Sequence, residues 1–340
     1  ARRAGTRGRT AGWDRAMSSG EEKVRKSSTR RVLFSRVATK ASLLNDHEQE
    51  LLMTEGEEQH GLMMKNVIKV QRAYRVRKTV YKHFGPNLFM CSKGFPASGR
   101  IAFTTDAHEH APWISVSHKT SPARLAVFVK EYWGLSEPKL LISVCGGRED
   151  FKLPPTLNQA FDEGLAAAAT SAHAWIFTGG MDTGVMKLVG NSVAKYGRTV
   201  PLIGIVPWGC VNGREHLEDH LSQIAPYTAE AGGTPSPDGA PLNRQHTHFV
   251  FVDNAKEGRA AWDSEREMRQ TLELAVCKAQ KTPVVQLVVE GTAADMETVL
   301  YSAMAGQPIV VVHESGGAAG AIHDFKFGGI EAVEPEFRQV

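Results

Sequence analysis

From residue 139 onward, short apolar segments alternate with segments of helical length. Apolar residues run through each strand-like segment: Lys139–Cys145, Ala174–Thr178, Leu202–Val206, Phe249–Val252, Val284–Val289 and Ile309–Val312. The segments between them predict helices at Thr156–Ser171, Val185–Tyr196, Arg214–Gln223, Asp263–Gln280 and Ala293–Met304. Strands that alternate with helices predict βαβ units, and strands apolar on both faces are typical of a covered parallel sheet. We therefore expect an α/β fold, a Rossmann-like doubly wound and mostly parallel sheet of about six strands.

The pattern predicts three parts along the chain. Residues 1–47 lack apolar periodicity and are rich in Arg, Lys, Ser, Thr and Gly, which predicts a disordered basic tail. Residues 48–86 contain a predicted basic amphipathic helix. Residues 88–330 are the predicted globular domain, which begins with short apolar runs and a predicted helix at Ala123–Trp133.

The predicted amphipathic helix spans Leu62–Phe84, a segment without Pro or Gly that ends at Gly85-Pro86. Val67, Val70, Tyr74 and Tyr81 share one helical face, and Lys and Arg crowd the remainder. A basic amphipathic helix is typical of calmodulin targets and of helices that lie on a membrane surface.

Charge is unevenly distributed along the chain. Residues 1–87 hold 19 Lys and Arg against 9 Asp and Glu, whereas the remainder holds 21 against 28. The basic charge therefore belongs to the N-terminal part, and an acidic domain argues against a nucleic-acid-binding surface. No stretch reaches the ~18 apolar residues of a spanning helix, so we expect this segment to be soluble. The chain begins at Ala1, and Met17 is an alternative start.

Cysteine and histidine give little sign of a metal or disulfide site. The four cysteines have neither zinc-ligand nor disulfide spacing, and we expect them to be reduced core residues in the cytosol. His108 and His110 flank a glutamate, and His246 and His248 flank a threonine. Neither pair has further partners at metal-ligand spacing, so no metal site is predicted.

Glycine-rich turns follow three of the predicted strands. Because ligands of such sheets bind outside the carboxyl ends of the strands, these turns are candidate phosphate contacts with a helix N-terminus beyond them. Hydroxyls and one lysine in the same turns are further candidates. The residues concerned are Gly146, Gly147, Thr178, Gly179, Gly180, Thr183, Gly184, Lys187, Gly316 and Gly317. The alternative is that each glycine pair only shapes a tight turn between a strand and a helix.

No catalytic set is apparent. The sequence has no paired carboxylates, no Gly-x-Ser-x-Gly nucleophile elbow and no P-loop. Asp182 and Asp253 follow predicted strands, where an acid can serve as a base or a ribose ligand, but a solvated loop carboxylate explains each equally.

Four motifs resemble, in order, those of one family, the N-terminal nucleotide-sensing domain of melastatin-type transient receptor potential (TRPM) channels. They are Leu140–Gly147 (LLISVCGG), Ala174–Gly180 (AWIFTGG) with Thr183–Lys187 (TGVMK), Ile203–Gly209 (IGIVPWG) and His246–Asp253 (HTHFVFVD). The resemblance runs from about Leu88 to Phe325. It implies a SLOG-type Rossmann variant that binds ADP-ribose or a related nucleotide in some members, with no other cofactor.

The resemblance also implies a setting and binding residues. The domain would be a ligand-sensing regulatory part of a calcium-permeable cation channel. It would lie at the cytosolic face of a membrane and contact the transmembrane region or sister subunits of a homotetramer. Trp262 resembles the family's aromatic residue that stacks on a ring of the ligand, and Arg269 its phosphate-binding arginine. Gly317 stands where nucleotide-binding members have a second arginine.

Related phosphoribohydrolases carry Pro-Gly-Gly-x-Gly-Thr-x-x-Glu with a catalytic glutamate. Here Thr178 takes the place of the proline and Met186 that of the glutamate. Because a thioether cannot transfer a proton, we predict a sensor with no catalytic residues and no enzyme activity. The alternative is a stand-alone nucleotide-processing enzyme of the SLOG superfamily.

The segment Val70–Arg75 (VQRAYR) resembles the start of an IQ motif, which implies calmodulin binding through Val70, Gln71 and Arg75. Val76 replaces the motif's central glycine, and Val80 its last basic residue. The alternative is a solvated basic helix.

Overall fold

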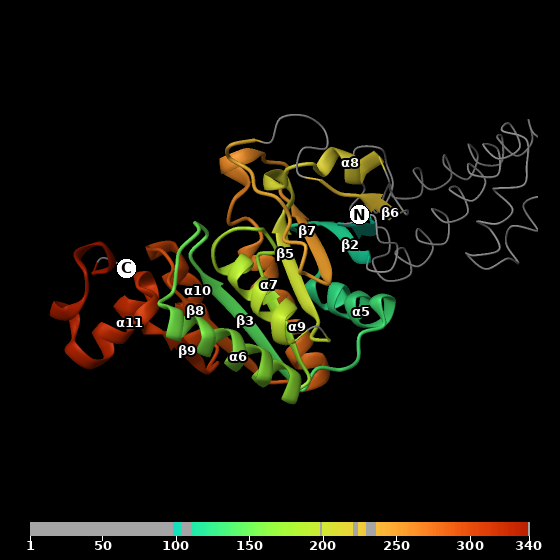
Figure 1. Ribbon diagram of the computed structural model, residues 1–340. Coiled ribbons are helices and arrows are strands. Elements are labelled where there is room, and N and C mark those ends of the chain that lie inside the picture. Colours follow the sequence, from blue (N-terminus) through green and yellow to red (C-terminus); the bar gives the residue numbers. More distant parts are fainter. Residues whose placement is uncertain (1–97, 104–109, 198, 220–223, 229–235, 339–340) are drawn as a thin grey trace, which may run out of the picture. The chain divides into compact units, whose positions relative to one another are not determined.

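The computed structural model describes residues 98–103, 110–197, 199–219, 224–228 and 236–338 (Figure 1). The predicted basic tail, the predicted amphipathic helix and the IQ-like residues Val70, Gln71 and Arg75 lie outside these ranges, and the structure does not test them.

A nine-stranded sheet forms the centre of the described domain, in the order β6-β1-β2-β7-β5-β4-β3-β8-β9. Seven neighbouring strands, from β2 to β9 in this order, are parallel, whereas β1 is antiparallel to β2 and pairs in parallel with β6. The strands are β1 (Ser98–Ala102), β2 (His110–Ser117), β3 (Leu140–Gly146), β4 (Ala174–Thr178), β5 (Leu202–Pro207), β6 (Ile224–Pro226), β7 (His248–Asp253), β8 (Val284–Val289) and β9 (Ile309–Val312).

The predicted α/β class and mostly parallel sheet are confirmed, but the number of strands was too low. The six predicted strands are β3, β4, β5, β7, β8 and β9. The three additional strands, β1, β2 and β6, extend the sheet beyond β7. Pro112 lies within β2, and β6 has only three residues, so neither gives the long apolar run by which the six strands were predicted.

The helices lie on both faces of the sheet (Figure 1). Residues of α6 and α7 pack in the cluster on one face, and residues of α5 and α9 pack in the cluster on the other. The helices are α5 (Pro122–Trp133), α6 (Pro155–Ser171), α7 (Gly184–Tyr196), α8 (Arg214–Asp219), α9 (Arg266–Gln280), α10 (Ala293–Met304) and α11 (Gly317–Gly328). Among the described residues, no helix combines the length and the apolarity needed to cross a membrane.

Side chains along β3 point alternately to the two faces of the sheet and pack with the helices on both. Ile142 and Val144 pack with α6 and α7, whereas Leu141 packs with α5 and α9. Cys145 lies on the same face as Leu141 and packs with Val288, against α10 and α11. Complete burial of such a side chain stabilises the fold by about 1.5–3 kcal/mol. The sheet is therefore held from both sides, as its apolar sequence predicts.

The described cysteines fit the expected reduced core role. Cys145, Cys210 and Cys277 are all free thiols. Burial raises the pKa of Cys145 and of Cys210 to about 12, so both stay protonated and unreactive at neutral pH.

Strand order creates a crevice between β3 and β8. After β3 the chain continues through α6 to β4 on one side, and after β8 it continues through α10 to β9 on the other side. The loops that leave the carboxyl ends of these neighbouring strands therefore diverge, which is where doubly wound sheets bind ligands.

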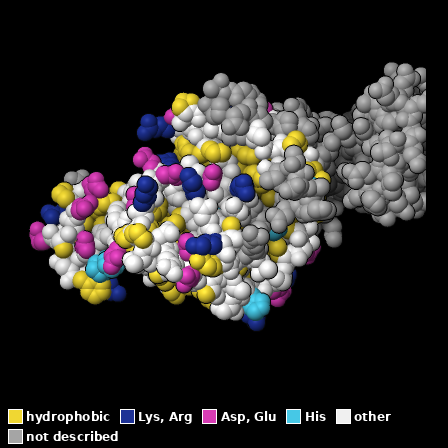
Figure 2. All heavy atoms as spheres, in the orientation of Figure 1, with side chains coloured by type: hydrophobic (Ala, Val, Ile, Leu, Met, Phe, Trp, Pro, Cys, Tyr) yellow, Lys and Arg dark blue, Asp and Glu magenta, His cyan; other side chains and the backbone are white. Residues whose placement is uncertain are grey.

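The exposed surface carries both signs of charge. On the face shown in Figure 2, Lys and Arg side chains are interspersed with Asp and Glu. That face has no continuous basic area of the kind that tracks a phosphate backbone.

Candidate ligand-binding site

A narrow cleft lies at the carboxyl ends of β3, β4 and β5 and reaches the first turn of α10, the helix that follows β8. We call it the carboxyl-edge cleft. It is lined by Val144, Cys145, Gly146, Arg148, Gly179, Val185, Met186, Pro207, Trp262, Asp263, Glu265, Arg266, Arg269 and Asp295. Its volume of about 50 Å³ is far below that of a typical small-molecule pocket, so a ligand larger than one phosphate group must widen it.

Arg269 lies at the bottom of this cleft, on α9. Its side chain is buried, and its Nη1 donates to the Val144 carbonyl at 3.3 Å. Its Nε has no hydrogen-bond partner among the described residues. Buried polar groups without partners are rare in native structures, so this nitrogen retains the capacity to donate a hydrogen bond to another group. The guanidinium is therefore suited to bind an anion that enters the cleft.

Two buried carboxylates flank Arg269 one helical turn away on either side. Glu265 and Glu273 share its face of α9 because they lie four residues before and after it. Burial raises the pKa of both carboxyls to about 7, and the positive charge of Arg269 counteracts this rise. Each also has one oxygen without a partner among the described residues.

Two further arginines lie at the mouth of the cleft. Arg266 is held by acids, with 3.1 Å contacts to both Asp263 and Asp295. Arg148, in the loop after β3, lies over the Trp262 ring at 5.2 Å from its centroid and 3.8 Å from Asp263. The Arg148 side chain is 44% exposed, so these contacts lie at the surface of the domain.

Comparison with known proteins identifies the domain. A family model described as SLOG in TRPM matches residues 111–326. The chain belongs to this family. A transient receptor potential cation channel subfamily M member-like 2 of Nematostella vectensis is 34% identical over 255 residues, 69% of this chain and 16% of that protein.

Two mammalian channels show similar likeness to this SLOG domain. The subfamily M member 1 channel of Mus musculus is 37% identical over 63% of this chain and 14% of its own length. The subfamily M member 2 channel of Rattus norvegicus is 31% identical over 71% of this chain and 17% of its own. The chain thus spans about a sixth of the length of such relatives. It corresponds to the N-terminal SLOG region of a TRPM channel.

Four of the predicted binding residues of the SLOG domain line the cleft together: Gly146, Gly179, Trp262 and Arg269. Trp262 is fixed by its indole nitrogen, which donates to the Asp238 carbonyl at 2.7 Å. Met186, at the position of the catalytic glutamate in the related hydrolases, also lines the cleft.

The predicted phosphate contacts at the start of α7 are engaged within the chain. Asp150 accepts a hydrogen bond from the Gly184 nitrogen at 2.9 Å and one from Lys187 Nζ at 2.8 Å. The Lys187 bond holds the pKa of Asp150 below its usual range. A carboxylate of the chain thus takes the place expected for a ligand phosphate. Gly147 and Thr183 adjoin this arrangement, and neither lines the cleft.

Thr178 and Gly180 make hydrogen bonds inside the domain. Thr178 is fully buried, and its Oγ1 lies 2.7 Å from His246 Nε2 and accepts a bond from the Gly180 nitrogen at 3.0 Å. The Gly180 carbonyl in turn accepts from the Asn243 nitrogen at 3.0 Å. Both residues therefore tie β4 to the segment before β7, and neither lines the cleft.

Gly316 and Gly317 form the turn into α11 and also lie outside the cleft lining. Gly317 has a φ of +54°, and a Cβ there would lie 2.3 Å from the Gly291 carbonyl oxygen. An arginine at this position would require the backbone to move. The turn therefore accounts for the glycine without any ligand.

Sequence reasoning missed the charged residues that line the cleft with Arg269: Arg148, Asp263, Glu265, Arg266 and Asp295. The available signal was position, because Arg148 directly follows Gly146-Gly147 and the others lie at or before the first turns of α9 and α10. No cluster of metal-ligating side chains occurs within the part of the chain that the structure describes.

Proposed function

We propose that the carboxyl-edge cleft binds the phosphate of an ADP-ribose-like nucleotide and that this domain is a ligand-sensing regulatory part of a TRPM-type cation channel. The buried, incompletely bonded guanidinium of Arg269 carries the proposal. Trp262 would stack on a ring of the ligand once Arg148 leaves its face. Arg148 and Arg269 would then both donate hydrogen bonds to the phosphate, to which a guanidinium can donate two parallel N–H bonds.

Calorimetry with ADP-ribose tests this proposal. Arg148→Gln should weaken binding about tenfold, equivalent to about 1.4 kcal/mol, while the exposed position of Arg148 leaves the fold intact. Arg259→Gln, at an exposed arginine outside the cleft, is the matched control and should bind like the wild type. Absence of heat with folded wild-type protein at millimolar ADP-ribose contradicts the proposal.

The wider setting is proposed from the relatives, which are named as cation channels. We propose that the domain lies at the cytosolic face of a calcium-permeable homotetramer and contacts the transmembrane region or sister subunits. Calmodulin is a further proposed partner, through the basic amphipathic helix that the sequence predicts at Leu62–Phe84. Calorimetry of the chain with calcium-loaded and calcium-free calmodulin tests that part, and Val70→Asp on the apolar face should abolish binding.

One observation favours the alternative, a nucleotide-processing enzyme. Glu265 lines the cleft, and its burial raises its pKa to about 7, a value suited to general acid–base catalysis at neutral pH. Chromatography of nucleoside monophosphates after incubation with the protein separates the two functions. Release of free base that is lost in Glu265→Gln supports the enzyme, whereas intact nucleotide supports the sensor.

A further inference from the structure

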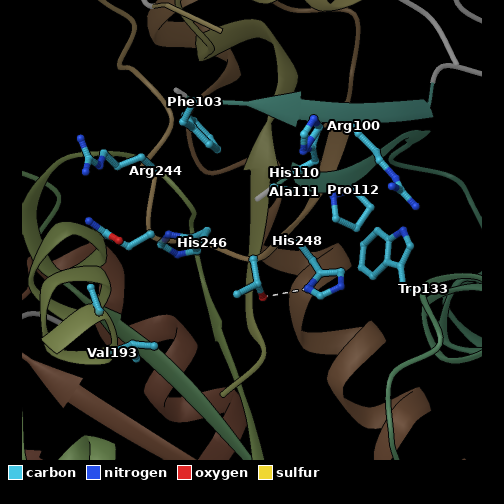
Figure 3. Close-up of a pocket in the computed structure, with 13 residues that line it drawn as sticks. Arg100, Phe103, His110, Ala111, Pro112, Trp133, Val193, Arg244, His246 and His248 are labelled. Carbon is cyan, nitrogen blue, oxygen red and sulfur yellow. Dashed lines mark hydrogen bonds between the residues drawn. The ribbon is translucent and has the colours of Figure 1, made fainter. Parts of the chain in front are cut away.

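A second and larger cleft lies at the opposite edge of the sheet, where the parallel strands begin (Figure 3). We call it the amino-edge cleft. Its lining includes the first residues of β2 and β7, the last residue of α5 and the last turn of α7. Its volume of about 670 Å³ is within the range of small-molecule sites.

The charged and titratable side chains described in this lining are all basic. They are Arg100, His110, Arg244, His246 and His248, with no Asp or Glu among the described lining residues. The chain after residue 87 holds more acidic than basic residues, 28 against 21. The positive charge of this concave surface is therefore opposite in sign to the net charge of that part of the chain. A cleft lined by one sign of charge concentrates ions of the other sign.

The two arginines are available for a ligand. Arg100 and Arg244 are both exposed. The salt bridges among the described residues involve neither of them. In Figure 3, Arg244 lies on one side of the cleft and Arg100 on the other, with His248 between them. An anionic group can therefore be bound on either side.

Between the arginines the surface is aromatic and apolar. The rings of Trp133 and His248 lie 4.8 Å apart, and Pro112 and Phe103 add further apolar area. Burial lowers the pKa of His248 to about 4, and its Nδ1 lies 2.8 Å from Thr247 Oγ1. At neutral pH this histidine is therefore an uncharged part of the wall, and the arginines supply the positive charge.

We propose that the amino-edge cleft is a second ligand site of this domain, which takes a small molecule with phosphate or carboxylate groups on an aromatic or apolar body. Each part of that chemistry has a counterpart in the lining. The arginines bind the anionic groups, and the surface around Trp133 covers the body. This site does not depend on the carboxyl-edge cleft, because the two share no lining residue.

The test uses phenyl phosphate as the probe and calorimetry of the whole chain as the measurement. Inorganic phosphate and phenol, each carrying half of the chemistry, should bind more weakly than phenyl phosphate. Arg100→Gln and Arg244→Gln should each weaken phenyl phosphate binding about tenfold, equivalent to about 1.4 kcal/mol. Because both arginines are exposed, these variants should keep the wild-type melting temperature.

Two control variants locate the binding event. Arg259→Gln should leave phenyl phosphate binding unchanged, and so should Arg148→Gln in the carboxyl-edge cleft. If Arg148→Gln removes binding while the Arg100 and Arg244 variants retain it, the probe occupies the other cleft and the proposal is wrong. It is equally wrong if the wild type gives no heat at roughly 10 mM probe, or if the separate halves bind as tightly as the whole. ADP-ribose binding in the Arg100 and Arg244 variants then shows whether the proposed function stands independently.

Discussion

The two edges of the sheet differ in the volume of their clefts and in whether their charged side chains are paired. At the carboxyl edge, glycine turns bring backbone segments together, and the charges of Arg266, Lys187 and Asp150 are bonded within the chain. The cleft that remains has a volume of about 50 Å³. At the amino edge, the cleft of about 670 Å³ is open, and its two exposed arginines take part in no salt bridge among the described residues.

This difference shows that a conspicuous motif and an accessible site need not coincide. Glycines mark positions where the backbone passes close to another segment, and such packing removes space as readily as it admits a ligand. The amino-edge cleft has no motif of its own, because its lining comes from five separate stretches of the chain. Three predictions test how strictly the two edges differ.

Gly184→Ala should have the largest effect, because it disrupts the packing of the carboxyl edge. Gly184 has a φ of +51°, and a Cβ there would lie 2.1 Å from the Gly147 carbonyl oxygen. The atoms that this Cβ would meet all belong to the backbone of Gly147 and Arg148, so they cannot give way as a flexible side chain would. We expect the free energy of unfolding to fall by more than about 3 kcal/mol in urea denaturation.

Gly134→Ala, at the amino edge of the sheet, is the matched control. Gly134 follows Trp133 at the amino edge and has a φ of +66°, but a Cβ there would have no atom within 4 Å. Only the conformational cost remains, about 1–2 kcal/mol. Equal losses for the two alanine variants would show that the carboxyl edge is no more tightly packed than the amino edge.

The pH dependence of stability should have opposite sign at the two edges. Between about pH 4.5 and 7, folded Glu265 and Glu273 keep protons that the unfolded chain releases, so their contribution to stability falls as pH rises. Burial lowers the pKa of His246 to about 3 and of His248 to about 4. Below about pH 6.5 these histidines bind protons in the unfolded chain but stay neutral in the folded protein. Their contribution to the free energy of unfolding therefore rises with pH.

Urea denaturation from pH 4.5 to 7 separates the two contributions. The variant Glu265→Gln/Glu273→Gln should remove a downward slope of about 1.4 kcal/mol per pH unit for each carboxyl. His248→Gln should remove an upward slope of the same size between about pH 4 and 6.5. If either variant has the wild-type slope, the corresponding group is ionised in the folded protein as it is in the unfolded chain.

Much of the fold could be predicted from local pattern. The six strands β3, β4, β5, β7, β8 and β9 are apolar throughout because helices cover both of their faces, and this leaves a clear signal. The pairing of β1 with β6 depends on residues more than a hundred positions apart, such as Ala102 and Pro226. No local window contains that information.

The site divides in the same way. Trp262 and Arg269 were identified through their motif, and both line the carboxyl-edge cleft. The role of Asp150, in the loop after β3, was not foreseen, because it accepts a hydrogen bond from Gly184 at the start of α7, 34 residues away in sequence. The same holds for Arg100 and Arg244, which only the finished sheet brings to one cleft. Residue types that mark a site are visible in sequence, whereas the residues that fill or neutralise it are set by tertiary packing.

Thr178→Val should have a smaller effect and tests the link from β4 to the amino-edge cleft. Thr178 Oγ1 lies 2.7 Å from Nε2 of His246, a buried residue of that cleft, and also accepts from the Gly180 nitrogen. Valine keeps the shape but leaves both partners unsatisfied, which costs about 1–3 kcal/mol of unfolding free energy. Thr178→Ser retains the hydroxyl and should lose less unfolding free energy than Thr178→Val does.

In calorimetry, ADP-ribose binding should persist in both folded variants, because Thr178 lies outside the carboxyl-edge cleft. If Thr178→Val stays as stable as the wild type but loses ADP-ribose binding, Thr178 is a ligand contact after all, and the two edges are less separate than their linings indicate.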